Sequence, residues 1–118
     1  MRFTLLLFAL AQILRVAARF NTRFKHYIAK TRVKIMIKTA DNTRGRLLIF
    51  DKGKVFSLPG TRHAFDAALV WQDAATGFNV MTSKKPEASF NAAAEGKLRV
   101  EGMSVYAQWL EDGLKLLL

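Results

Sequence analysis

One long stretch without glycine or proline, from residue 3 to residue 28, limits how this chain can begin. Projected at 100° per residue, its apolar and polar side chains separate onto two sides. The apolar side carries Phe3, Leu7, Leu10, Leu14, Ala17, Phe24 and Ile28, and the polar side carries Gln12, Arg15, Arg19, Arg23, His26 and Lys30. This pattern predicts one strongly amphipathic, basic helix over residues 3 to 28.

Positive charge is concentrated in the same half of the chain. Residues 1 to 54 carry thirteen Lys and Arg against two acids, a net charge of +11, whereas residues 55 to 118 carry six against seven, a net charge of −1. The first acidic residue is Asp41. We therefore expect the leading segment to be attracted to a polyanion, either a nucleic acid backbone or an anionic membrane surface.

The leading segment has several interpretations. A membrane-spanning helix needs about 20 apolar residues, and Arg15 interrupts the run. A signal peptide cleaved near Ala9-Leu10-Ala11 would have a very short apolar region, and a transit peptide would be expected to contain Ser before Ser57. Two interpretations stay open with equal weight: a helix packed on the domain's own core, and an interfacial membrane anchor. For the anchor, the membrane-facing residues are Phe3, Leu7, Leu10, Leu14, Arg15, Arg19 and Arg23.

Alternating apolar residues and turn residues predict strands in the rest of the chain, over residues 33–39, 46–50, 55–58, 67–71 and 97–101. The first three are joined by short turns at Asp41-Asn42 and around Gly53, so we expect them to form an antiparallel meander. The fourth is apolar throughout and is expected to be buried on both faces.

Three helices are predicted after the fourth strand. Asp73 is placed to cap a short helix with Gly77 in its middle, where a glycine indicates close approach by another group. Pro86 suits the first position of a second helix that stops at Gly96. The last helix runs from Met103 to about residue 117, and its apolar arc is wide enough to need more than one partner.

The last third of the chain resembles a known family. Pro86-Glu87-Ala88-Ser89-Phe90, then Ala94-Glu95-Gly96-Lys97-Leu98-Arg99-Val100-Glu101-Gly102 and a closing amphipathic helix, are similar to the type-two sterol carrier proteins, a family of lipid-transfer domains. Residues 45–50 and 53–55 fit the family's meander more loosely, so the resemblance covers residues 30–118. It implies an α+β domain with a five-stranded, mostly antiparallel sheet covered by helices. Residues 1–30 would add an N-terminal amphipathic helix to a lipid-binding domain at 31–118.

The resemblance also implies an apolar tunnel between sheet and helices that holds a lipid tail or a sterol. Its ligand-binding residues would be Phe78, Met81, Phe90, Met103, Tyr106, Leu110 and Leu114. Family members carry fatty acids, acyl thioesters, phospholipids and sterols, and bacterial relatives include accessory factors of ubiquinone biosynthesis. Two departures from the family pattern affect cavity size and mouth polarity: Ala92-Ala93-Ala94 stand where an aromatic is common, and Met103 stands where Asp is common.

An empty apolar tunnel would be costly, because a dry cavity of about 300 Å³ would lower stability by up to roughly 7 kcal/mol. We therefore expect it to be filled, either by a bound lipid or by residues 3 to 14 folding back as a plug.

No enzymatic activity, cofactor or metal is expected. The chain has no Cys, no nucleophile elbow and no nucleotide-binding glycine motif, and His63 with Asp66 reads as a solvated turn. The predicted function is a non-enzymatic lipid or isoprenoid carrier in the cytoplasm, peripherally bound to an anionic membrane. Two alternatives remain: a nucleic-acid module using Phe20, Phe24 and Tyr27 among basic residues, and a structural subunit that pairs with a partner or a second copy through the first helix.

Overall fold

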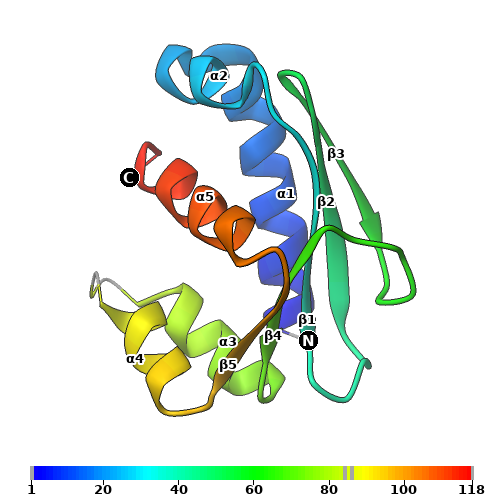
Figure 1. Ribbon diagram of the computed structural model, residues 1–118, viewed down its shortest axis with the longest axis vertical. Helices are drawn as coiled ribbons and strands as arrows, with labels where there is room; N and C mark the ends of the chain where they lie inside the picture. The colour runs from blue at the N-terminus through cyan, green and yellow to red at the C-terminus, as the bar shows by residue number, and fades with distance from the viewer. Residues whose placement is uncertain (1, 84, 86, 118) are drawn as a thin grey trace.

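The computed structural model describes residues 2–83, 85 and 87–117. Along the chain its elements are α1 (Arg2–Phe20), α2 (Thr22–Ile28), β1 (Arg32–Thr39), β2 (Gly45–Asp51), β3 (Lys54–Pro59), β4 (Ala67–Trp71), α3 (Ala74–Met81), α4 (Ala88–Ala94), β5 (Leu98–Gly102) and α5 (Ser104–Lys115). The predicted α+β class is confirmed (Figure 1). The position predicted for Pro86 lies outside the described residues.

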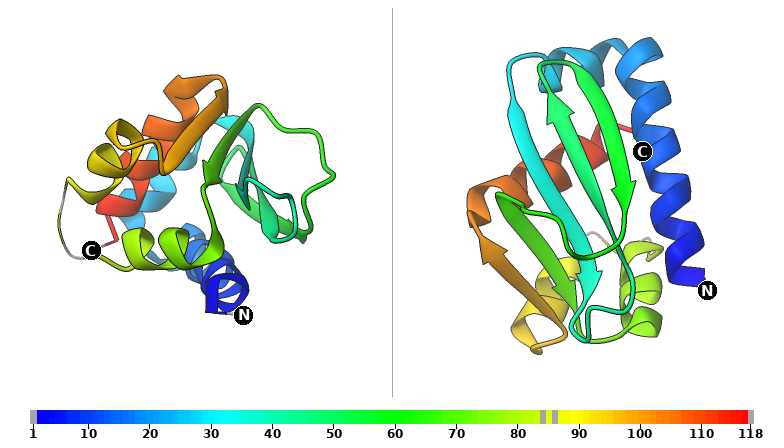
Figure 2. Two further views of the ribbon diagram at one scale, coloured as in Figure 1. Left: turned by 90° about the horizontal axis from the view of Figure 1, so that it is seen from below. Right: turned by 90° about the vertical axis from the view of Figure 1, so that its right-hand side faces the viewer.

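The five strands form one sheet in the order β3-β2-β1-β4-β5. The meander β1-β2-β3 is antiparallel, as predicted, and β4 pairs antiparallel with β5. Only the central pair is parallel among the described strands, with Ile35 opposite Ala67 and Thr39 opposite Trp71. A parallel neighbour requires a crossover, and the loop between β3 and β4 supplies it across the outer face of the sheet (Figure 2).

All five helices of the described chain lie on the other, inner face of the sheet (Figures 1 and 2). Alternate residues of β1, namely Val33, Ile35 and Ile37, point into this layer and are at most 2% exposed. Near the middle of the outer face, Met36, Leu47, Ala68 and Val70 are buried and Phe65 of the crossover loop packs on them. All five residues of β4 are buried, which confirms the prediction for that strand.

The prediction of one helix over residues 3 to 28 is wrong. The helix ends at Phe20, because Asn21 adopts an extended backbone and begins a second helix. The Asn21 side chain accepts a hydrogen bond from the backbone N–H of Phe24 at 3.0 Å. Asn is among the most favourable N-cap residues, so a cap breaks the helix without glycine or proline.

Helix α1 packs its apolar stripe on the sheet. Phe3, Leu7, Ala11 and Leu14 are at most 3% exposed and belong to the same core cluster as the inner residues of β1. The structure therefore follows the interpretation in which this helix packs on the domain's own core. The division of the chain near residue 30 stays a prediction about organisation, since both parts share that core.

Gly77 confirms the close approach predicted for it. A methyl group at this position would stand 2.7 Å from Cε1 of Phe3 and 3.0 Å from Cγ of Trp71. These distances are shorter than van der Waals contact, so α3 approaches α1 and β4 as closely as its backbone allows. Asp73 also caps α3 as predicted, since its Oδ1 accepts from Thr76 N at 2.7 Å.

Candidate functional site

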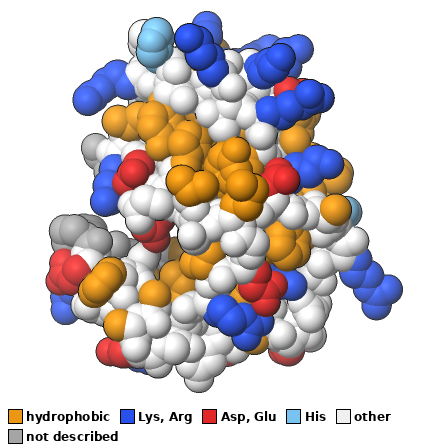
Figure 3. Space-filling view, in the orientation of Figure 1, with side chains coloured by type: hydrophobic (Ala, Val, Ile, Leu, Met, Phe, Trp, Pro, Cys, Tyr) orange, Lys and Arg blue, Asp and Glu red, His pale blue; other side chains and the backbone are white. Residues whose placement is uncertain are grey.

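A cavity of about 530 Å³ lies between the inner face of the sheet and helices α3, α4 and α5. It opens at the surface as the hollow visible beside α4 in Figure 3. Ile37 of β1 and Leu69 and Trp71 of β4 line its inner end. Ile37 and Leu69 are direct partners in the parallel pair, and Leu69 and Trp71 are two residues apart, so strand geometry places all three on one face.

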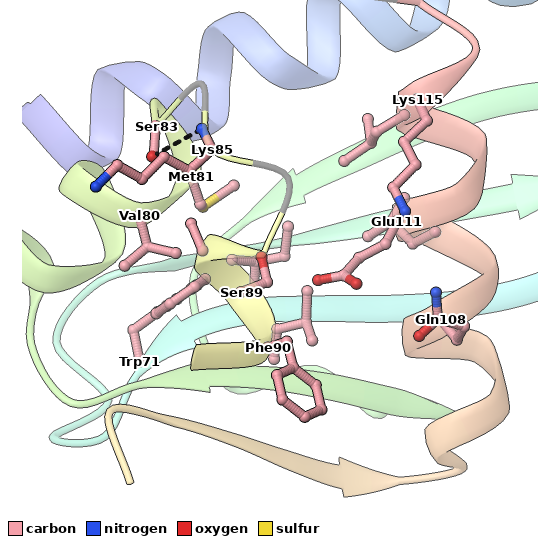
Figure 4. A pocket seen from close by; sticks show the side chains of 15 residues that line it. Trp71, Val80, Met81, Ser83, Lys85, Ser89, Phe90, Gln108, Glu111 and Lys115 are labelled. Atoms are coloured by element: carbon pink, nitrogen blue, oxygen red, sulfur yellow. Dashed lines mark hydrogen bonds between the residues drawn. The ribbon is translucent and has the colours of Figure 1, made fainter. Parts of the chain in front are cut away.

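The helices supply the walls of this cavity. Leu110 and Leu114 are four residues apart on α5, so they share one face of that helix. Val80 and Met81 come from the end of α3, across the cavity from α5 (Figure 4). Helix α4 contributes Ala88, Ser89 and Phe90; the first two are small and Phe90 is 77% exposed, so this helix leaves the space between the larger walls unfilled.

Polar residues lie around the mouth: Ser83, Lys85, Ser89, Gln108, Glu111 and Lys115. Two of them are already engaged within the protein. The Gln108 amide donates to Oδ1 of Asp112 at 3.0 Å, and the Ser83 hydroxyl oxygen accepts from the backbone N–H of Lys85 at 3.2 Å. The interior is therefore apolar and the entrance polar, an arrangement typical of sites for small amphiphilic molecules.

Four of the seven residues predicted to bind ligand line this cavity: Met81, Phe90, Leu110 and Leu114. Phe78 is turned instead toward α1, where the guanidinium of Arg2 lies 5.7 Å from its ring centroid. Met103 precedes α5 and is 55% exposed, and Tyr106 packs against the core. The last three are therefore not cavity residues in this structure.

Sequence reasoning missed the inner end of the cavity, formed by Ile37, Leu69 and Trp71. The alternation in β1 did indicate that Ile37 shares a face with Val33 and Ile35. It could not indicate that β4 lies beside β1, because that pairing depends on the crossover. The plug hypothesis also fails for this cavity, since no residue of α1 lines it.

The residues predicted to face a membrane divide into two groups. Phe3, Leu7 and Leu14 are buried against the sheet, which corrects their assignment, because the inner face of β2 and β3 needs an apolar cover. Leu10 is half-buried, and Arg15, Arg19 and Arg23 are exposed. The apolar side chains that α1 does expose are others: Leu5, Phe8, Ile13, Val16 and Phe20, each at least 49% exposed.

A groove of about 500 Å³ runs between the outer face of α1 and the β2–β3 hairpin. Arg15, Arg19 and Lys54 line it together with Val16, Phe20 and Phe56, and no acidic residue lines it. By length and composition α1 is the one helix of the described chain that could cross a membrane, although a third of its apolar window is buried inside the domain. The groove combines cationic and apolar side chains on one exposed face.

The remaining polar candidates have structural partners. Nε2 of His63 lies 2.8 Å from the carbonyl oxygen of Pro59, and the Asp66 carboxylate accepts from the backbone N–H of Lys34 at 2.8 Å. Among the described residues, no group of three or more His, Asp and Glu is placed to hold a metal ion.

Comparison with known proteins identifies the fold. No protein-family model and no curated protein matches the sequence. Among solved structures, "UbiJ-SCP2 Ubiquinone synthesis protein" superposes with a TM-score of 0.72 over 95% of each chain at 13% identity. The sterol carrier protein domain 2 of Helicoverpa armigera gives a TM-score of 0.58 at 20% identity, over 93% of this chain and 87% of the other.

The same fold also occurs as part of a larger protein. Two structures of the sec-alkyl sulfatase PisA1 match 77% of this chain with TM-scores of 0.59 and 0.52 at 13% and 12% identity, but only 14% of the sulfatase chain is covered. At these identities the comparisons establish the fold, and the chain has the sterol carrier protein 2 fold predicted from its last third.

Proposed function

We propose that this sterol carrier protein 2 fold is a non-enzymatic carrier that binds one lipid or isoprenoid molecule in the cavity beneath α3, α4 and α5. The observation that carries the proposal is the open, apolar-walled cavity of about 530 Å³. Ligand cavities in proteins typically measure about 300 to 1,000 Å³. Structures of the same fold are described as sterol carrier proteins and as a ubiquinone synthesis protein, which supports an apolar ligand.

The energetics of burial suit such a ligand. Each CH₂ group transferred from water into apolar surroundings contributes about 0.8 kcal/mol. Ten such groups therefore supply about 8 kcal/mol, which corresponds to a micromolar dissociation constant. An apolar chain alone is enough for reversible binding, which is what a carrier requires.

The polar groups at the mouth support binding without chemistry. Among the described residues, no nucleophilic hydroxyl there forms a hydrogen bond with a carboxylate or imidazole that could act as its base. A nucleophile needs such a base within hydrogen-bond reach. We therefore assign the cavity to transport or presentation of its ligand.

Filling the cavity tests the carrier proposal. Leu114→Trp places an indole in the cavity, whereas Val105→Trp adds the same group at an exposed position of the same helix, outside the cavity lining. We expect the wild-type chain and Val105→Trp to bind all-trans-retinol, a fluorescent apolar alcohol, with micromolar affinity. We expect Leu114→Trp to bind it at least about tenfold more weakly.

Equal binding by the two Trp variants would contradict this placement of the ligand. Circular dichroism and thermal unfolding of both variants provide the control for folding. Organic extraction and mass spectrometry of the purified wild-type chain would then identify which molecule occupies the cavity.

We also propose that the carrier works at an anionic membrane surface and that the outer face of α1 with the β2–β3 hairpin makes the contact. Its exposed apolar residues Val16, Phe20 and Phe56 are placed to enter the acyl boundary. Arg15, Arg19 and Lys54 line the same groove and match anionic headgroups, each contributing about 1 kcal/mol. The absence of acidic residues from this lining means that nothing there offsets the attraction.

Vesicle co-sedimentation tests the membrane contact. Binding is expected to vesicles with about 30% phosphatidylglycerol and to weaken as salt rises, because the charges are exposed. Replacing Arg15 and Arg19 together by Gln should reduce binding by about tenfold or more. The matched control replaces Arg62 and Arg99, which lie outside this groove, by Gln.

Three results would contradict the membrane contact. Equal loss in the control pair would show that net charge alone matters. Binding to an oligonucleotide in preference to the vesicles would favour the nucleic-acid alternative. Concentration-dependent self-association that is lost in Phe20→Ser would assign the exposed face of α1 to a second copy of the chain.

A further inference from the structure

We propose that the cavity selects ligands whose polar end is a neutral hydrogen-bond donor, such as an alcohol or a phenol, and that Glu111 is the residue that discriminates against anionic lipids. This inference rests on the proposed carrier function, because it concerns the same cavity. It assigns a headgroup chemistry where the apolar walls select only for volume and length.

Glu111 occupies the mouth between the ligand walls and solvent. It lies on α5 next to Leu110 and three residues before Leu114, both of which line the cavity, and its side chain is only partly exposed. In Figure 4 its carboxylate is turned away from its own helix, across the mouth toward Ser89 of α4. Among the described residues, no Lys, Arg or His nitrogen lies within 4.0 Å of this carboxylate.

Two of the other polar residues at the mouth already form hydrogen bonds within the protein. Gln108 and Ser83 are held by Asp112 and by the backbone of Lys85. The side chain of Lys85 extends away from Glu111 in Figure 4. Lys115, one turn after Glu111 on α5, is an exposed cation that also lines the mouth.

This arrangement suits a hydroxyl better than a carboxylate. An ionised carboxylate only accepts hydrogen bonds, so Glu111 pairs with a ligand O–H, and a charge-assisted bond of this kind is stronger than a neutral one. The ligand oxygen can then accept from the Ser89 hydroxyl. An anionic headgroup would instead place two like charges in one partly desolvated mouth, and Lys85 and Lys115, which are both exposed, compensate only weakly for that repulsion.

A pair of retinoids with one skeleton and two headgroups tests the inference. All-trans-retinol ends in a hydroxyl and all-trans-retinoic acid ends in a carboxylate. At pH 8 we expect the wild-type chain to bind retinol about tenfold more tightly than retinoic acid. Glu111→Gln should reduce this preference to within about threefold, and Glu111→Lys should reverse it.

The control is Glu95→Gln, which removes an exposed carboxylate outside the cavity lining and should leave the preference unchanged. If both retinoids bind, and the wild-type chain prefers retinoic acid or shows no preference, the inference is overturned while the carrier function stands. A preference that Glu111→Gln and Glu111→Lys leave unchanged would overturn it in the same way. Binding of neither retinoid would overturn the carrier function and the inference together.

Discussion

The inner face of the sheet is covered in two different ways. Over β2 and β3, the single long helix α1 packs Phe3, Leu7 and Leu14 into a continuous core with no more than 3% exposure. Over β1, β4 and β5, three shorter helices leave a cavity of about 530 Å³. The same sheet therefore carries a closely packed core over β2 and β3 and a ligand-sized cavity over β1, β4 and β5.

The difference follows from the helices. An apolar stripe repeated at three- and four-residue spacing along nineteen residues lets α1 fill its half without interruption. Helices α3 and α4 have eight and seven residues and offer few large inward side chains, so they cannot fill the space that α5 leaves. Gly77 marks the boundary, because there α3 touches both Phe3 of the core and Trp71 of the cavity.

Replacing one leucine by alanine in each region should give the largest difference in the free energy of unfolding between the two regions. Leu14 is fully buried in the core, so Leu14→Ala should lower the free energy of unfolding by about 2 to 5 kcal/mol. Leu114 borders existing empty space, so Leu114→Ala should cost about 1 kcal/mol. Urea unfolding of both variants checks this, and equal losses would mean that the two halves are packed alike.

A substitution at Gly77, where the core and the cavity meet, should have an intermediate effect on stability. In an ordinary helix Gly→Ala stabilises by up to about 1 kcal/mol. At Gly77 the added methyl group meets Phe3 and Trp71, so Gly77→Ala should instead destabilise by about 1 to 3 kcal/mol. A rise in the melting temperature of this variant would show that the contact between α3 and α1 is looser than described.

The smallest effect concerns the N-terminal cap of α3. Hydrogen bonds from the Thr76 backbone and side chain lower the pKa of Asp73 below 3.8. The stabilisation by the ionised cap is therefore complete above pH 3.8 and is lost as the pH falls through the lower native pKa. Asp73→Ala should lower the melting temperature by a few degrees at pH 7, and the deficit should shrink below pH 3.8.

Asp73→Asn is the matched control, because Asn keeps the capping acceptor but has no carboxyl to titrate. Its melting temperature should stay close to that of the wild type at pH 7. A deficit for Asp73→Ala that persists unchanged into acid would contradict the role of the ionised cap.

Much of the fold could be predicted from local patterns. Alternation fixed the position of β1, turn residues around Gly53 defined the hairpin, and Asp73 marked the start of α3, since each depends on neighbouring residues only. The break at Asn21 was predictable in principle, because Asn is a preferred N-cap, but the helical pattern continues through it and masks the cap.

The rest depends on long-range contacts. The apolar side predicted for α1 includes Phe3, Leu7 and Leu14, which are buried, but the sequence could not say whether that side would face the sheet or a membrane. The inner end of the cavity needs β4 beside β1, a pairing that follows from a crossover and not from any local pattern. Phe78 was predicted to line the cavity and instead turns toward α1, because it lies two residues before Val80, whose side chain lines the cavity, and two residues rotate a helical side chain by 200°.

Methyl chemical shifts measured by NMR during a retinol titration of the full chain test the central claim most directly, since methyl groups report on both halves at once. If the cavity holds the ligand, large shifts are expected for the residues that line it: Ile37, Leu69, Val80, Leu110 and Leu114. Little change is expected on the α1 side, for Leu7, Leu14 and Val55. Saturable shifts confined to the α1 side, or no saturable shifts on either side, would contradict the account.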